Sequence, residues 1–220
     1  MPRSLILEPT RELAAQVAAN FETYGKHHKL NMALLIGGVS FSDQEDKLNR
    51  GVDVLIATPG RLIDHFERGK VLLADIKVLV VDEADRMLDM GFIPDVEKII
   101  KLLPPIRQTA MFSATMPSEI KRLTDSYMMN PRTVQVDAAA SAAETVTQGL
   151  LRVNGGFAEK RAALRKLVRA TKVKNAIVFC NRKRDVATLE KSLTSHGFNA
   201  AALHGDMHQT ARMETLAKFR

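Results

Sequence analysis

The stretch Val78-Leu79-Val80-Val81-Asp82-Glu83-Ala84-Asp85 decides the fold, because four aliphatic residues run directly into a cluster of acids. A short apolar run without polar alternation is typical of a strand that is buried on both faces of a parallel sheet. In open α/β sheets, ligands bind at the carboxyl ends of such strands. These residues therefore predict a strand over residues 78–81 that presents carboxylates at a ligand-binding edge.

Similar apolar runs recur along the chain and alternate with stretches that have helical spacing. This alternation predicts βαβ units, a parallel sheet and hence an α/β fold. Strands are expected over residues 4–7, 31–36, 52–57, 78–81, 109–112, 134–136, 149–153, 176–180 and 200–203. Helices are expected over residues 10–24, 42–49, 61–68, 94–101, 117–128, 158–170, 184–196 and 208–220.

A small, polar segment divides the chain into two expected domains. We expect residues 138–147 to be a linker between a domain of residues 1–137 and a domain of residues 148–220. The net charge is +7, and the excess lies in residues 141–220, with 15 Lys and Arg against 6 Asp and Glu. The basic balance fits a polyanionic partner of the C-terminal part, although charge alone fits ordinary solubility equally well.

Composition excludes several classes of protein. A single cysteine, Cys180, rules out an internal disulfide and a cysteine cluster for zinc, and the six histidines show no metal-ligand spacing. Any metal should then be a hard cation that is held by carboxylates. No apolar run approaches the ~20 residues of a membrane span, and the N-terminus lacks the pattern of a secretory signal. We therefore expect a cytoplasmic protein with no membrane partner.

The acids after the strand at 78–81 have two interpretations. A carboxylate at Asp82 could hold Mg²⁺ through water, and Glu83 beside it could orient or deprotonate an attacking water. The simpler alternative is that Asp82, Glu83 and Asp85 only enrich the first turn of a helix, where acids favour the helix dipole.

Four more motifs follow other predicted strands: PTREL at residues 9–13, Gly37-Gly38, TPGR at residues 58–61 and SAT at residues 113–115. Because the carboxyl ends of parallel strands meet at one edge, we expect all of them on one rim. Each motif fits a loop or helix N-cap as local structure. Helix N-termini, hydroxyls and arginines in such loops also suit a phosphodiester backbone.

The ordered set PTREL, GG, TPGR, DEAD and SAT, with LDMGF after DEAD, resembles the DEAD-box ATP-dependent RNA helicases. The resemblance extends to AIVFCN at residues 176–181 and to LHGD at residues 203–206, so it covers essentially the whole chain. It implies RecA-like parallel sheets flanked by helices, with an incomplete first lobe followed by the first part of a second lobe.

The resemblance also implies cofactors, a partner and site residues. The cofactors would be ATP and Mg²⁺, with Asp82 holding the metal through water and Glu83 activating the hydrolytic water. Asp85, Ser113 and Thr115 would couple nucleotide state to RNA strand separation. Sequence-independent contacts to the RNA backbone are implied for Thr10, Arg11, Gly38, Thr58, Gly60, Arg61, Asn181, Gly205, Gln209 and Arg212. The absence of Trp and the presence of only two Tyr agree with backbone contacts, because base-stacking side chains are scarce.

The sequence departs from the family pattern at both ends. No phosphate-binding loop of the form G-x-x-x-x-G-K-[ST] occurs in it, and the Q motif, motif V and motif VI are also missing. We therefore expect a fragment, either of an incomplete reading frame or of a genuine short protein, that is catalytically incompetent by itself. A non-enzymatic RNA-binding remnant that modulates RNA structure is the main alternative, and a related DNA helicase or translocase is another.

Overall fold

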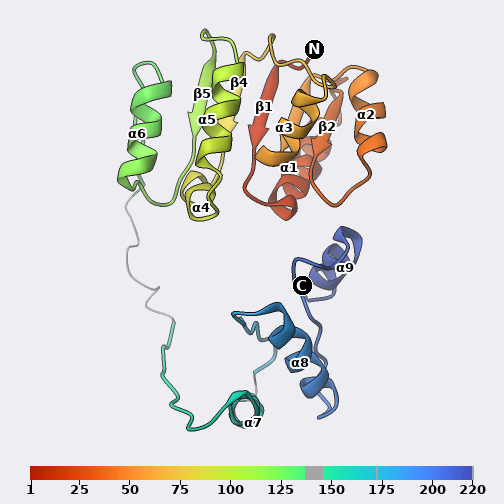
Figure 1. The fold of residues 1–220 in the computed structure, drawn as a ribbon, viewed down its shortest axis with the longest axis vertical. Coiled ribbons are helices and arrows are strands. Elements are labelled where there is room, and N and C mark those ends of the chain that lie inside the picture. Colours follow the sequence, from red (N-terminus) through yellow and green to blue (C-terminus); the bar gives the residue numbers. More distant parts are fainter. Residues whose placement is uncertain (137–145, 172, 220) are drawn as a thin grey trace. The chain divides into compact units, whose positions relative to one another are not determined.

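The computed structural model describes residues 1–136, 146–171 and 173–219 (Figure 1). The chain divides into two compact units, Met1–Thr133 and Val134–Arg220. Most of the expected linker, residues 138–145, lies outside the described residues, and the expected division into domains 1–137 and 148–220 stays a prediction. Among the helices of the described part, none is long and apolar enough to cross a membrane.

Unit 1 is built on one five-stranded sheet in the order β2-β3-β1-β4-β5, in which every neighbouring pair is parallel. Its strands are β1 (Ser4–Leu7), β2 (Met32–Leu35), β3 (Val54–Ala57), β4 (Val78–Val81) and β5 (Gln108–Met111). In register, Leu7 of the central strand β1 lies between Ala57 of β3 and Val81 of β4. The prediction of an α/β fold with a parallel sheet is confirmed here, with strand ends within two residues of those expected.

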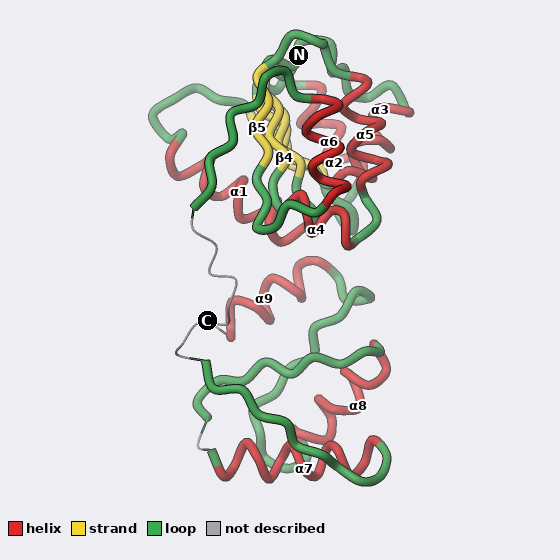
Figure 2. The backbone as a smooth tube through the Cα atoms, turned by 90° about the vertical axis from the view of Figure 1, so that its left-hand side faces the viewer, coloured by secondary structure: helices red, strands yellow, loops and turns green. Residues whose placement is uncertain are grey.

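Helices cover both faces of this sheet, as Figure 2 shows. The unit 1 helices are α1 (Arg11–Tyr24), α2 (Phe41–Asn49), α3 (Pro59–Glu67), α4 (Ala84–Asp89), α5 (Ile93–Leu102) and α6 (Ser118–Tyr127). One core layer joins Ile6 and Ile56 of the sheet to Ala14 and Ala18 of α1. The other layer joins the opposite faces of the same strands to α3, α4, α5 and α6. Because both faces are buried, the strands read as continuous aliphatic runs rather than as alternating ones.

The short helix α4 was not expected as a separate element. Glu83 precedes it with φ 44° and ψ 52°, which is the left-handed region that a residue with a Cβ rarely adopts. The strained residue turns the chain sharply from the end of β4 into α4. The other predicted helices are confirmed, and their ends lie within two residues of those expected.

Unit 2 contains α7 (Phe157–Ala170), α8 (Lys183–Thr194) and α9 (Gln209–Phe219). Arg165 Nη1 of α7 donates to Ser192 Oγ of α8 at 2.9 Å, and Arg169 Nη2 donates to the His196 carbonyl at 3.0 Å. These contacts hold the first two helices of the unit together.

The strands that we expected over residues 134–136, 149–153, 176–180 and 200–203 are wrong, because the described part of unit 2 contains no strand. A strand exists only through hydrogen bonds to a neighbouring strand, and an apolar run does not reveal whether that neighbour is in place. The side chains of two such runs are accordingly exposed, with Leu150 at 86% and Phe179 at 92%.

Candidate functional site

The carboxyl ends of the five parallel strands meet at one edge of unit 1, which we call the strand-end rim, residues 8–13, 36–40, 58–61, 82–85 and 112–115. Because of the strand order, the motifs line up along the rim as residues 37–38, 58–61, 9–13, 82–85 and 113–115. The glycine and arginine loops therefore occupy one half of the rim and the acids occupy the other half. The loop after the central strand β1, which carries Arg11, belongs to the first half and borders the acids after β4 (Figure 1).

Asp82 and Glu83 stand at the end of β4. The Asp82 N–H donates to the Leu7 carbonyl at 3.1 Å, which continues the ladder between β4 and β1. Asp82 Oδ1 accepts from the Glu83 N–H at 2.8 Å, and Glu83 Oε2 pairs with Arg86 Nη1 at 3.0 Å. Both carboxylates are half-buried. The site therefore offers two oriented carboxylates at an open edge, where a cation or a water could reach them.

Asp85 joins α4 to the loop after β5. Its Oδ2 accepts from the Thr115 N–H at 2.9 Å and from the Thr115 hydroxyl at 2.8 Å, and its own N–H donates to Ser113 Oγ at 3.1 Å. Ser113 Oγ in turn donates to the Thr115 carbonyl at 2.6 Å. Burial acts to raise the pKa of Asp85, but these bonds and one from the Arg86 N–H outweigh it and lower the pKa below its usual value. The three residues that we expected to act together are thus one hydrogen-bonded group.

On the other half of the rim, Arg11 lies against the glycine loop. Thr10 caps α1 by accepting from the Leu13 N–H at 3.3 Å, so that Arg11 is the first residue of the helix. Gly38 has φ 76°, and a Cβ at this position would collide with Arg11 Nη1. The backbone conformation therefore favours glycine at residue 38, and a Cβ there would force the Arg11 guanidinium to move.

Arg61 is the most heavily bonded arginine of the rim. Its Nε donates to Gln44 Oε1 at 3.2 Å, its Nη2 donates to the Val39 carbonyl at 2.9 Å, and its guanidinium carbon lies 4.4 Å from the centre of the Phe41 ring. Thr58 is the N-cap residue of α3, which begins at Pro59. A Cβ at Gly60 would meet nothing within 4 Å, so the rim is open at that position.

In unit 2, an ion pair lies beside Gly205, one of the expected RNA-binding residues. Lys183 Nζ pairs with Asp206 Oδ1, which brings the start of α8 beside the segment that contains Gly205. Arg212 Nη1 donates to the His204 carbonyl at 3.0 Å, and Gln209 at the start of α9 is buried. Asn181 is exposed just before α8. The structure thus brings Arg212 of α9 to the segment of residues 204–206, which contains Gly205.

Two family models match the chain. Residues 1–123 match the model described as DEAD/DEAH box helicase, and residues 159–220 match the model described as helicase conserved C-terminal domain. The chain belongs to the DEAD/DEAH box helicase family. The resemblance inferred from the motifs is thereby confirmed.

Individual proteins similar to this chain belong to the same family. The chain is 44% identical over 222 residues to the ATP-dependent RNA helicase RhlB of Pseudomonas putida, covering 100% of this chain and 55% of the relative. It is 40% identical over 221 residues to the ATP-dependent RNA helicase DeaD of Mycobacterium tuberculosis, covering 100% of this chain and 38% of the relative. A solved DEAD box protein from the hyperthermophile Methanococcus jannaschii superposes with a TM-score of 0.59 at 37% identity, over 99% of this chain and 58% of that chain. The chain therefore spans roughly half or less of the length of these proteins.

DEAD-box helicases use ATP, usually with Mg²⁺, and the carboxylate half of the rim fits the metal. Asp82 and Glu83 provide the hard oxygen donors that Mg²⁺ prefers. The described residues contain no cluster of three or more metal-ligating side chains, so the ion would keep much of its coordination from water and phosphate. These 220 residues contain no phosphate-binding loop of the form G-x-x-x-x-G-K-[ST] for the nucleotide.

Sequence reasoning missed Glu8, which follows β1 directly. The register that pairs Leu7 with Val81 places Glu8 next to Asp82, on the same face as Ile6. Its side chain is 0% exposed, and neither carboxylate oxygen has a hydrogen-bond partner among the described residues. Burial, followed by the charges of Asp82 and Glu83, raises the pKa of Glu8 to about 8. The neighbour relation depends on the pairing of β1 with β4, which the sequence does not reveal.

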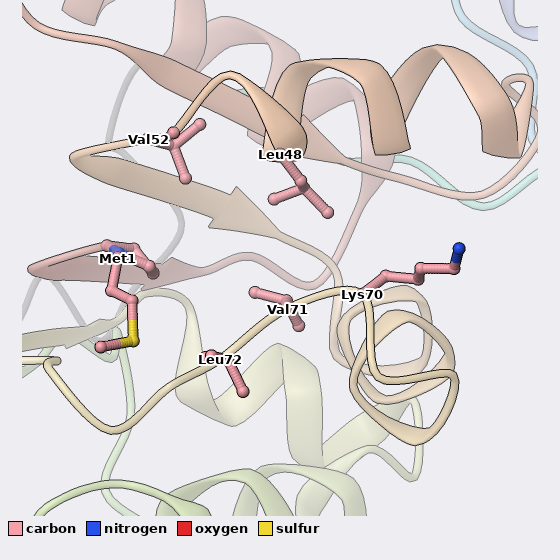
Figure 3. A pocket seen from close by; sticks show the side chains of 8 residues that line it. Met1, Leu48, Val52, Lys70, Val71 and Leu72 are labelled. Atoms are coloured by element: carbon pink, nitrogen blue, oxygen red, sulfur yellow. The ribbon is translucent and has the colours of Figure 1, made fainter.

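A cavity of about 160 Å³ lies at the opposite end of the sheet (Figure 3). It is lined by Met1, Pro2, Leu48, Gly51, Val52, Lys70, Val71 and Leu72. Its side chains are apolar apart from Lys70, whose Nζ pairs with Glu45 at 3.1 Å. Because it lies near the amino ends of β1 and β3, it has no part in the chemistry of the rim.

Proposed function

We propose that this chain belongs to an ATP-dependent RNA helicase of the cytoplasm that couples Mg-ATP hydrolysis to local separation of an RNA duplex. The observation that carries the proposal is the division of the strand-end rim, with carboxylates after β4 and arginine loops after β1 and β3. One half of the rim would bind the nucleotide and the other half would bind the RNA backbone. Because both halves lie on one rigid sheet edge, a change in the bound nucleotide could alter the contacts to RNA.

On the carboxylate half, we assign Asp82 to a hydrated Mg²⁺ and Glu83 to the attacking water. Mg²⁺ would supply charge neutralisation at the transferring phosphate. Glu83 would accept a proton from the water at its carboxylate, and its pairing with Arg86 at 3.0 Å supports a fixed orientation.

On the basic half, the assigned contacts are hydrogen bonds to RNA phosphates and 2′-hydroxyls without base readout. The residues are Thr10, Arg11, Gly38, Thr58, Gly60 and Arg61 in unit 1, and Asn181, Gly205, Gln209 and Arg212 in unit 2. The Asp85–Ser113–Thr115 group would transmit nucleotide state, since it ties the helix after the acids to the neighbouring loop.

The competing function for these 220 residues is RNA binding without turnover. The observation that favours it is the absence of a phosphate-binding loop from the sequence. We propose that turnover requires such a loop, and that the purified 220-residue chain therefore shows no RNA-stimulated ATP hydrolysis. Turnover that Glu83→Gln abolishes in this chain would contradict that requirement.

The substrate is tested by equilibrium binding to single-stranded RNA and DNA of identical sequence over a series of salt concentrations. We expect tighter binding to RNA, little dependence on base sequence, and an affinity that falls linearly with salt on a double-logarithmic plot. Equal affinity for the two nucleic acids would contradict the assignment to RNA and favour a DNA helicase or translocase.

A further inference from the structure

Arg61 belongs to the TPGR motif, but the residues that hold it do not belong to any motif. Gln44 of α2 is 3% exposed, and both the nitrogen and the oxygen of its side-chain amide are hydrogen-bonded. Its Nε2 donates to the Ile36 carbonyl at 3.0 Å, and its Oε1 lies 3.2 Å from Arg61 Nε and 3.1 Å from His65 Nε2. Because Oε1 can only accept, both of those nitrogens must donate.

His65 completes this arrangement as a neutral donor. It is buried, and burial followed by the charge of Arg61 lowers the pKa of its imidazole to about 4. The ring therefore carries its proton on Nε2, where it reaches Gln44. The same ring stacks on Phe41 with centroids 4.0 Å apart and an interplanar angle of 16°. Phe41 in turn lies beneath the guanidinium of Arg61.

The carbonyls that this group binds flank the glycine loop. Gln44 holds the Ile36 carbonyl just before Gly37, and Arg61 holds the Val39 carbonyl just after Gly38. These two hydrogen bonds fix both ends of the Gly37-Gly38 loop, which lies next to the Arg11 guanidinium. The glycine loop and the two arginines of the basic half are thus fixed relative to one another through Gln44.

We propose that Gln44, with Phe41 and His65, is a positioning unit that orients Arg61 for a phosphate of the RNA backbone. Two of the three guanidinium nitrogens, Nε and Nη2, are held by the protein. Nη1 has no hydrogen-bond partner among the described residues, so its two N–H groups, with the second N–H of Nη2, remain for the ligand. Holding a long arginine in one conformation before binding reduces the entropy that is lost on binding. The proposal rests on the proposed RNA-binding function of Arg61.

The test is a double-mutant cycle that measures RNA affinity of the full 220-residue chain, with Gln44→Met, Arg61→Ala and the double variant. Gln44→Met keeps the length and volume of the side chain but removes its hydrogen bonds. We expect Gln44→Met to weaken RNA binding by up to about tenfold, because an oriented charged donor is lost. In the Arg61→Ala background, Gln44→Met should change the affinity by less than about twofold.

Three controls separate positioning from folding. Gln16→Met makes the same exchange at an exposed position of α1, and Arg122→Ala removes a charge from α6. Circular dichroism confirms that each variant is folded at the temperature of the measurement. If Gln44→Met does not fold, Phe41→Leu tests the same unit, since it removes the aromatic platform and keeps an apolar side chain.

The outcomes are distinguishable. An equal loss of affinity from Gln44→Met in both backgrounds would overturn the positioning role, while the RNA-binding role of Arg61 would stand. An Arg61→Ala variant with unchanged affinity and unchanged salt slope would overturn the RNA-binding role and the positioning role together. The proposal is supported if Gln44→Met weakens RNA binding in the wild-type background but not in the Arg61→Ala background. The slope of log affinity against log salt concentration should then also be flatter by about 0.7 in Gln44→Met.

Discussion

Glu8→Gln should remove the contribution of Glu8 to the pH dependence of the stability of unit 1, which acts between pH 4.5 and about 8. The wild-type carboxyl has a usual pKa of 4.5 when exposed and a pKa of about 8 in the fold. Between these values the folded state binds a proton that the unfolded state has released. Stability therefore falls as the pH rises through this window and stays low above it. Below pH 4.5 both states are protonated, and the carboxyl contributes nothing.

The size of the effect follows from the same two values. A displacement of the pKa from 4.5 to about 8 corresponds to at most about 5 kcal/mol of free energy of unfolding at high pH. Such a difference is a large fraction of the 5–15 kcal/mol that is typical of a domain.

The assay is urea denaturation of the wild-type chain and Glu8→Gln at intervals from pH 4.5 to pH 9, with EDTA present to remove divalent cations. The amide that this substitution introduces adds unpaired donors in a buried place, so the informative quantity is the change of the difference with pH. We expect the variant to gain stability relative to wild type as the pH rises. Glu22→Gln provides the same exchange at an exposed position of α1. Parallel curves for wild type and Glu8→Gln would refute the buried, unpaired carboxyl.

Two further predictions concern the rim. Gly38→Ala should displace Arg11 and weaken RNA binding severalfold at every sequence. It should also cost about 1–2 kcal/mol of stability, measured by urea denaturation. Gly69→Ala is the matched control, because Gly69 has φ 66° but open space around it, and equal loss of RNA affinity in both variants would exclude displacement of Arg11 as the cause. Asp85→Ala should loosen the loop after β5 by about 1–3 kcal/mol, since two hydrogen bonds from Thr115 lose their acceptor. Hydrogen exchange at the Thr115 amide should then accelerate by at least tenfold, and unchanged protection would contradict the coupling role that we propose for Asp85.

The sheet of unit 1 could be predicted because its strands are buried on both faces. Runs such as Val54–Ala57 consist of aliphatic residues with no polar alternation, which few other environments tolerate. The parallel arrangement then placed the motifs at one edge without any knowledge of strand order. The run at residues 176–180 is likewise apolar without polar alternation and forms no strand, because pairing depends on a neighbour that composition does not specify.

The residues of the candidate site that lie in sequence motifs could be predicted. The residues whose role depends on packing between helices could not. Asp85, Ser113 and Thr115 were expected together, and three hydrogen bonds join Asp85 to the other two. Gln44 lies outside the motifs, and its role appears only when α2 is set beside α3. One signal was available, since Gln44 precedes Leu48 by four residues and therefore falls on the face of α2 that packs against the core.

The left-handed conformation of Glu83 could not be read from the sequence either. Such a conformation costs about 1–3 kcal/mol in a residue with a Cβ and persists only where the surrounding structure enforces it. Here the Asp82 carboxylate accepts from the Glu83 N–H, and the Ala84 N–H donates to the Phe112 carbonyl at 3.0 Å, so that both sides of the residue are fixed.

The measurement that tests the central claim most directly is RNA-stimulated ATP turnover by wild type and Glu83→Gln, in a polypeptide that carries this chain together with a phosphate-binding loop. Removal of the water-activating carboxylate should lower turnover by about 10²-fold or more and leave ATP binding intact. Near-normal turnover in Glu83→Gln would contradict the assignment of the carboxylate half of the rim to catalysis.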